Sequence, residues 1–209
     1  MEKNIAPVDP TAMFRLSYGL FVLSARQDGR DNGCIINTVT QVTTTPNRIT
    51  IAVNKANHTH DMIAATGEFA VSVLSQEAPF EIFKHFGFQS GRDTDKFAGW
   101  AASRRANNGV LYLTACTNAY MAAKVVDRWE LETHTVFLAE VTEAGVLSDA
   151  PSMTYAYYHA EVKPKPQPKP EKKGFVCTVC GYIHEGDTLP EDFVCPLCKH
   201  GAQDFKPLE

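Results

Sequence analysis

The sequence predicts a mainly β fold, a β-barrel with peripheral helices, followed by a small cysteine-rich module. Segments rich in β-branched and aromatic residues recur through residues 1–162, while few segments there have a helical pattern. Four of the six cysteines fall within residues 177–198. Many strands with few helices favour a barrel for the larger part, and the cysteines mark a second, separate unit.

Four segments are predicted as strands because they combine β-formers with turn residues at most of their ends. They are Gly19–Ala25, Arg48–Asn54, Glu68–Ser75 and Val136–Val141. Two short helices are expected as well. Asn57–Ala65 follows a capping-type Asn, and Pro79–Phe86 has Pro near its start with Phe at helical spacing.

A domain boundary is predicted at Lys163–Lys173, which is written KPKPQPKPEKK. Its prolines remove backbone donors and fix φ, so an extended polyproline II spacer is expected. The predicted domains are therefore residues 1–162, the linker 163–173 and the module 174–209. The charge divides unevenly among them, at −4, +4 and −4, so that an acidic module follows a basic stem.

The overall charge excludes some classes of partner. The chain has 20 basic and 24 acidic side chains, for a net charge of −4, and this argues against a nucleic-acid binder.

No run of about 18 apolar residues is present, so no membrane span is predicted. The first ten residues lack the apolar stretch of a signal peptide. We therefore expect a soluble, cytoplasmic protein.

The cysteine pattern is the most specific signal in the chain. Two C-x-x-C pairs present four sulfurs at a spacing that suits one tetrahedral ion, either zinc or iron. The predicted ligands are Cys177, Cys180, Cys195 and Cys198. Iron is favoured over a zinc ribbon by Gly181 after the second cysteine, by aromatic residues that surround the cysteines, and by the module's acidity.

The segment GFVCTVCGYIHEG…LPEDFVCPLC resembles rubredoxin. This resemblance implies one iron held by the four cysteines that carries single electrons. Two departures are evident. The fourteen-residue spacer resembles the shortened version attached to rubrerythrins, and Lys199 stands where the family usually has Gly. The turn at Lys199 is therefore expected to be strained or differently shaped.

Two polar segments in the larger domain are candidate ligand contacts. The run Asn37–Pro46, NTVTQVTTTP, offers hydroxyls and amides that suit the edge of a heterocycle, although a Thr-rich strand is usually only a strand. The run Asn54–His60, NKANHTH, lies between a predicted strand and a helix start. Such a position suits a phosphate, and simple N-capping by Asn57 is an equal alternative.

Together with SYGLFVLSA, GEFAVSVLSQ and HFGFQSGRDTDKF, these segments resemble the flavin reductase-like, FMN-binding split-barrel family. The resemblance implies a homodimer that binds FMN. Along the isoalloxazine ring and the ribityl chain it would place Asn37, Thr38, Gln41 and Thr43. Around the phosphate it would place Lys55, Asn57, His58 and Thr59.

Contacts on the nicotinamide side are expected from His85, Arg92 and His159. The segment His85–Arg92 would close over the flavin or the nicotinamide side, and Arg92 would pair with Asp93, Asp95 or a ligand phosphate. His159 belongs to a Tyr-Tyr-His segment that resembles the family's closing segment. A packed histidine without a chemical role is the alternative for it. No residue that selects NADH or NADPH can be assigned.

The combination of both parts resembles the high-molecular-weight rubredoxins of anaerobes. It implies an NAD(P)H-dependent flavin and rubredoxin oxidoreductase that feeds a flavodiiron protein reducing nitric oxide or dioxygen. A flavin is the required converter, because a nicotinamide delivers two electrons at once and an Fe(Cys)4 centre takes one. Two alternatives stay open: an FMN-binding protein with a structural zinc ribbon for docking, and a free flavin reductase that supplies reduced flavin.

Overall fold

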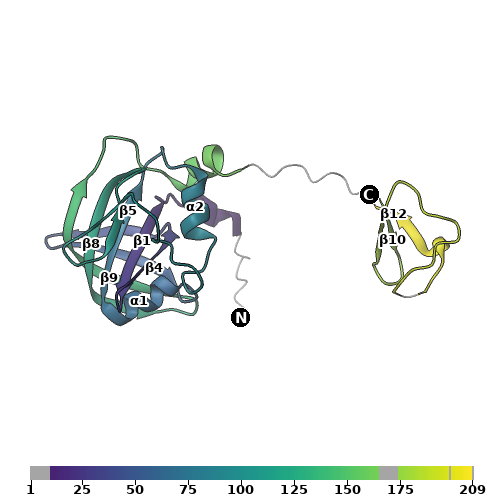
Figure 1. Cartoon of the computed structure of the whole chain (residues 1–209), viewed down its shortest axis with the longest axis horizontal. Helices are drawn as coiled ribbons and strands as arrows, with labels where there is room; N and C mark the ends of the chain where they lie inside the picture. The colour runs from purple at the N-terminus through teal and green to yellow at the C-terminus, as the bar shows by residue number, and fades with distance from the viewer. Residues whose placement is uncertain (1–9, 165–173, 198, 209) are drawn as a thin grey trace, which may run out of the picture. The chain divides into compact units, whose positions relative to one another are not determined.

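The computed structural model describes residues 10–164, 174–197 and 199–208. The chain separates into two compact units, Met1–Lys163 and Pro164–Glu209, each with its own core (Figure 1). From residue 165 on, the predicted linker lies outside the described residues. In the described part of the chain, no helix has the length and apolar character needed to cross a bilayer.

The larger unit is built on one seven-stranded antiparallel sheet with the order β2-β1-β5-β8-β9-β4-β3. The strands are β1 Phe21–Gln27, β2 Arg30–Ile36, β3 Val39–Thr44, β4 Asn47–Asn54, β5 Glu68–Leu74, β8 Thr117–Glu130 and β9 His134–Val146. The edge strands β2 and β3 are joined by only Asn37 and Thr38, so the sheet must curl until its edges meet. The result is a barrel (Figure 1), and the mainly β prediction is confirmed.

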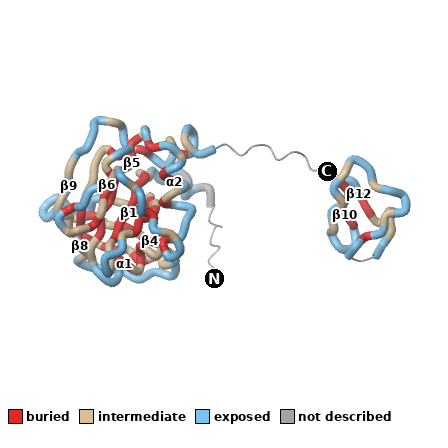
Figure 2. The backbone as a smooth tube through the Cα atoms, in the orientation of Figure 1, coloured by how far each residue is buried: buried red, intermediate tan, exposed pale blue. Residues whose placement is uncertain are grey.

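The barrel interior is filled by the alternating apolar residues of its strands. In β4, Ile49, Ile51 and Val53 are buried while the intervening residues are less so. They join one core with Leu23 of β1 and Phe137 of β9. Figure 2 shows buried segments, in red, along the strands inside this unit. The strand β3 differs, because all its residues beyond Val39 are exposed. The barrel therefore presents a polar strand at its edge.

Two helices cover the barrel. Helix α1, His58–Thr66, adds Met62 and Ile63 to the barrel core and ends at Gly67, whose φ of 72° closes its last turn. Helix α2, Phe80–Gly87, begins after Pro79 and buries Ile82, Phe83 and Phe86 in a second cluster on the outer face of the sheet. The smaller elements are η1 Pro10–Arg15, β6 Ser103–Arg105, β7 Leu111–Leu113, α3 Tyr155–Tyr157 and η2 Tyr158–Val162.

The smaller unit holds a three-stranded sheet of order β11-β10-β12. Its elements are β10 Gly174–Cys177, β11 Ile183–Glu185, η3 Ala202–Asp204 and β12 Phe205–Pro207. Cys177, Cys195 and Phe205 are buried in its core. The expected aromatic surroundings are confirmed, because Phe175, Tyr182 and Phe193 pack against these residues.

Candidate metal centre and flavin site

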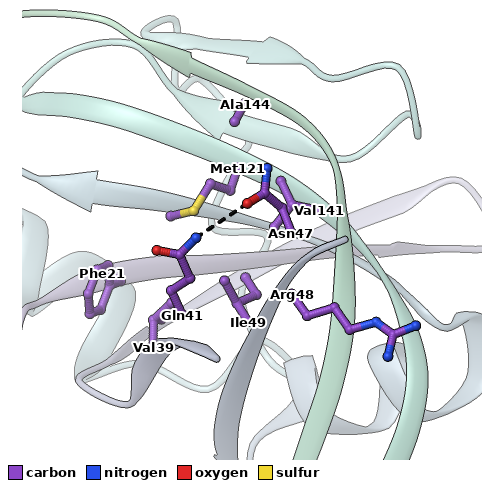
Figure 3. Close-up of a pocket in the computed structure, with 9 residues that line it drawn as sticks. All are labelled: Phe21, Val39, Gln41, Asn47, Arg48, Ile49, Met121, Val141 and Ala144. Atoms are coloured by element: carbon purple, nitrogen blue, oxygen red, sulfur yellow. Dashed lines mark hydrogen bonds between the residues drawn. The ribbon is translucent and has the colours of Figure 1, made fainter. Parts of the chain in front are cut away.

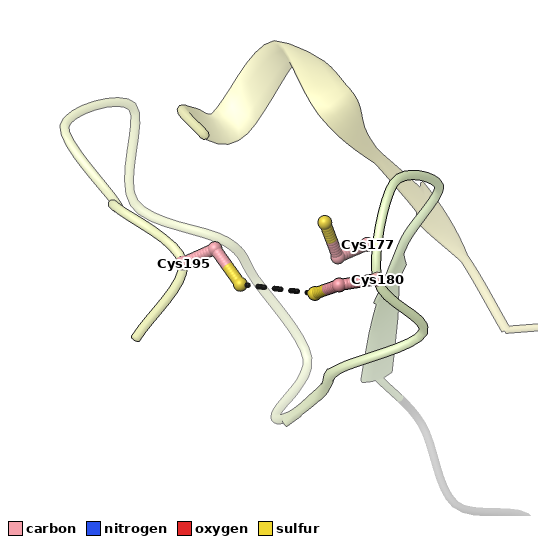
Figure 4. Close-up of side chains that lie close together, drawn as sticks. All are labelled: Cys177, Cys180 and Cys195. Atoms are coloured by element: carbon pink, nitrogen blue, oxygen red, sulfur yellow. Dashed lines mark hydrogen bonds between the residues drawn. The ribbon is translucent and has the colours of Figure 1, made fainter. Parts of the chain in front are cut away.

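Three of the four predicted metal ligands converge in the smaller unit. The Sγ atoms of Cys177, Cys180 and Cys195 all lie within 4.8 Å of one another, and those of Cys180 and Cys195 are 3.5 Å apart (Figure 4). Thiolates bound at about 2.3 Å around a tetrahedral ion stand roughly 3.8 Å from each other. The three sulfurs therefore fit such an ion. Cys198 lies outside the described residues.

Both cysteine loops are closed in the same way. The backbone N–H of Gly181 donates to the Cys177 carbonyl at 2.9 Å, and that of Lys199 donates to the Cys195 carbonyl at 3.0 Å. The φ angles of Gly181 and Lys199 are 76° and 61°, both in the left-handed region. Lys199 thus adopts the turn that its usual glycine would adopt, and a side chain there costs about 1–2 kcal/mol.

One side of the metal centre is accessible from solvent. Cys177 and Cys195 are buried, whereas Cys180 is exposed. Exposed apolar side chains flank the cysteines in both loops, namely Val179, Val194 and Leu197. This unit therefore exposes an apolar rim of three side chains together with one cysteine thiol.

In the larger unit, strand register brings the two predicted flavin segments side by side. Val39 pairs with Ile51, and the Thr38 hydroxyl donates to the Ala52 carbonyl at 2.7 Å. The Asn37–Thr38 end of β3 therefore lies near the end of β4 that leads to Lys55. Gln41 pairs with Ile49 toward the other end. Thr38 and Thr43 are five positions apart in the sequence, a spacing of about 17 Å along extended chain.

A cavity of about 350 Å³ opens beside Gln41 (Figure 3). The Gln41 amide donates to Asn47 Oδ1 at 3.3 Å, while Arg48 points away from this pair. The remaining lining is apolar and comes from β1, β3, β4, β8 and β9: Phe21, Val39, Ile49, Met121, Val141 and Ala144. An apolar wall with a few amide groups suits a planar heterocycle. Thr43 bonds the Pro46 carbonyl within its own hairpin.

The predicted phosphate contacts have different environments. The Lys55 ammonium donates to the Leu131 carbonyl and lies 3.0 Å from the Glu130 carboxylate. Asn57 precedes α1 and makes no side-chain cap. His58 is half-buried, and burial together with nearby Arg92 lowers its pKa. Thr59 is fully buried and accepts from Asn32, so its side chain is closed to solvent.

The three predicted nicotinamide contacts lie in separate settings. His85 donates from Nε2 to the Lys96 carbonyl and stacks on Trp100. Arg92 pairs with Asp61 at 2.7 Å rather than with its neighbours in sequence. His159 is exposed and lines a second cavity of about 370 Å³ together with Tyr18 and Tyr155.

Sequence patterns did not indicate the buried polar residues beside these sites. Lys96 is 2% exposed, and its ammonium donates to the carbonyls of Gly33 and Phe86 at 2.9 Å each. His60 is buried and bonds Thr135, 75 residues away. A lysine in a polar loop and a histidine at a helix start suggest surface residues, so no signal short of the fold identifies them.

Comparison with known proteins agrees with the two-part organisation. Residues 13–165 match the family described as flavin reductase like domain, and residues 175–206 match the rubrerythrin, rubredoxin-like domain. A high molecular weight rubredoxin of Moorella thermoacetica is 36% identical, over 96% of this chain and 100% of that protein. A ferric-chelate reductase (NAD(P)H) of Archaeoglobus fulgidus is 40% identical, over 73% of this chain and 89% of its own length.

Solved structures share the fold of the larger unit. An NADH:FAD oxidoreductase of Streptomyces globisporus superposes with a TM-score of 0.62 at 24% identity, covering 71% of this chain and 90% of that one. A flavoredoxin of Methanosarcina acetivorans superposes with a TM-score of 0.56 at 22% identity, covering 62% and 68%.

Proposed function

Because the chain belongs to the flavin reductase-like family and carries a C-terminal rubredoxin-like domain, we propose that it passes electrons from NADH or NADPH through FMN to one Fe(Cys)4 centre. The observation that carries this proposal is the presence of both redox units in one chain. A flavin accepts a hydride and gives up electrons singly, which suits a one-electron iron centre. The nicotinamide donor is also supported by the name of the Archaeoglobus relative.

The chain's own residues supply positioning for this transfer. Asn37 and Gln41 would line the flavin ring and ribityl chain, since they lie along one polar segment beside the apolar cavity. Lys55, Asn57 and His58 would face the phosphate where β4 meets α1. Thr38, Thr43 and Thr59 have their hydroxyls committed within the protein, so any contribution from them to flavin binding is indirect. No side chain needs to act as a nucleophile.

We further propose that the chain works as a cytoplasmic homodimer with a flavodiiron protein as its electron acceptor. The module of residues 174–209 would carry the electrons, with residues 163–173 as its tether. Its net charge of −4 suits docking to a basic surface. The exposed apolar rim around Cys180 would form the contact itself.

A full-length Cys195→Ser variant separates this proposal from its alternatives. Loss of one buried thiolate should abolish iron binding, leave NAD(P)H-driven flavin reduction near the wild-type rate, and stop reduction of a flavodiiron acceptor. If acceptor reduction continued at the wild-type rate, the chain would act as a free flavin reductase. If the wild-type protein, purified without added metal, held zinc and no iron, the module would be a structural ribbon.

A further inference from the structure

A series of polar contacts, called here the hydrogen-bond chain, links Arg92 to Lys55, one of the proposed phosphate contacts. It begins at Arg92, passes through the start of α1 to β9, and ends at Lys55 after β4. Its links are Arg92 Nη2 to Asp61 Oδ2 at 2.7 Å, Asp61 Oδ1 to His60 Nδ1 at 3.1 Å, His60 Nε2 to Thr135 Oγ1 at 2.8 Å, Thr135 Oγ1 to Glu130 Oε2 at 2.9 Å, and Glu130 Oε2 to Lys55 Nζ at 3.0 Å.

His60 is held at both edges of its ring. Nδ1 lies 3.1 Å from the Asp61 carboxylate, and Nε2 lies 2.8 Å from the Thr135 hydroxyl. The Thr135 hydroxyl in turn donates to Glu130 Oε2 at 2.9 Å. His60 therefore joins the start of α1 to β9 and, through Thr135, to the carboxylate that pairs with Lys55.

Burial makes the middle of the hydrogen-bond chain rigid, while the two side chains at its ends stay accessible to solvent. Thr135 is fully buried and His60 is 9% exposed, with its ring against Phe137. The side chains of Lys55 and Arg92 are 36% and 50% exposed. The same contacts stabilise the carboxylates, because His60 and then Arg92 lower the pKa of Asp61, while Lys55 and then Thr135 lower that of Glu130.

We infer that His60 is a positioning residue that holds Lys55 in place for the phosphate of FMN. The His60 ring orients Thr135, the Thr135 hydroxyl orients Glu130, and Glu130 with the Leu131 carbonyl uses two of the three N–H groups of Lys55. The third N–H remains for an anion. This inference rests on the proposed function, in which Lys55 contacts the flavin phosphate.

The test compares flavins with and without the phosphate. Affinities of the full-length protein for FMN and for riboflavin are measured by flavin fluorescence after removal of bound flavin, and their ratio reports the phosphate contact. Lys55→Gln should lower the ratio at least about tenfold, since it removes a charged hydrogen bond. Thr135→Val and His60→Gln should each lower it by about three- to tenfold. Thr142→Val is the matched control, because Thr142 lies on the same strand as Thr135 and takes no part in the hydrogen-bond chain.

A second readout does not depend on flavin. In the 15N-histidine-labelled full chain, the His60 ring nitrogen resonances, assigned through His60→Gln, should shift in Thr135→Val and stay unchanged in Thr142→Val, because, of these two threonines, only Thr135 bonds the ring. Unchanged His60 resonances in Thr135→Val would overturn the inference. So would an unchanged FMN-to-riboflavin ratio in Thr135→Val alongside a lowered ratio in Lys55→Gln. If Lys55→Gln itself left the ratio unchanged while the His60 resonances responded to Thr135→Val, the failure would lie in the phosphate contact of the proposed function and would end the positioning role with it.

Discussion

The hydroxyl of Thr38 donates to the carbonyl of Ala52 at 2.7 Å and accepts from the backbone N–H of the same residue at 3.3 Å. The Thr38 side chain thus makes the two hydrogen bonds to β4 that a backbone partner would make in a regular sheet, at the point where the polypeptide leaves β2 and enters β3. This contact fixes the junction between the two edges of the barrel to β4. It also sets the distance between the two predicted flavin segments.

Replacing Thr38 with Val should therefore weaken both the fold and flavin binding. The variant keeps the shape and loses both hydrogen bonds, so the unfolding free energy should fall by about 1–3 kcal/mol, since the Ala52 groups are left without their partner. Urea unfolding and the flavin content of purified protein measure the two effects. Thr38→Ser retains the hydroxyl and should behave as wild type. Equal stability of the Val and Ser variants would contradict this role.

The buried ammonium of Lys96 predicts a pH dependence of stability. Burial lowers its pKa from 10.5 in the folded protein. Between the lowered pKa and 10.5, the unfolded chain binds more protons than the folded one, so stability should rise with pH across this window. Lys96→Met lacks this group, and its difference from wild type in urea unfolding should change between neutral pH and pH 10.5. A constant difference would show that the pKa of Lys96 is the same in the folded and the unfolded protein.

The thiol of Cys34 should be inert in the folded protein. Burial raises its pKa to about 11, and the thiolate is the reactive form. Iodoacetamide at neutral pH should leave Cys34 unlabelled in native protein and label it fully in denaturant, as peptide mass spectrometry would show. Rapid labelling of Cys34 in native protein would mean that this part of the barrel opens readily.

Positions 181 and 199, one in each cysteine loop, both have φ angles that favour glycine. Introducing glycine at 199 and removing it at 181 should therefore have opposite effects on the stability of the smaller unit. Lys199→Gly should stabilise the smaller unit by about 1 kcal/mol, because it removes a side chain from the left-handed region. Gly181→Ala should destabilise it by a similar amount. The cause would be backbone strain alone, because Gly181 has a φ of 76° and an added Cβ would meet no atom within 4 Å. Lys199→Ala removes the charge and keeps the strain, so it should resemble wild type.

The rate of iron release to a chelator at raised temperature ranks these variants. The order expected is Lys199→Gly slowest and Gly181→Ala fastest. An Ala variant at 199 that releases iron as slowly as the Gly variant would assign the effect to the lysine charge.

The elements that sequence patterns predicted are those with local signals. Strand β4 and helices α1 and α2 were predicted within one residue at each end, since β-branched alternation or a start signal marks them. Strand β2, RDNGCII, has no such signal, and β8 contains a run of Ala and charged residues along its 14 residues. Both are strands because their neighbours in the sheet pair with them.

The sites divide in the same way. The cysteine spacing predicted the convergence of the three described thiols, Cys177, Cys180 and Cys195, because each C-x-x-C turn is local. Arg92 was predicted to pair with Asp93, Asp95 or a ligand phosphate, and the structure instead pairs it with Asp61, which lies 31 residues away and is brought near by α1. The pairing of His60 with Thr135 likewise depends on the packing of α1 against β9. Contacts of this kind follow from topology, which local patterns do not specify.

Anaerobic addition of NADH or NADPH to the full-length protein loaded with FMN and iron follows the proposed electron path from the nicotinamide to the iron. Visible spectra record the flavin and iron absorption together. Both bands should bleach, with the iron band following the flavin band. Reduction of the flavin with the iron left oxidised would contradict the proposed electron path.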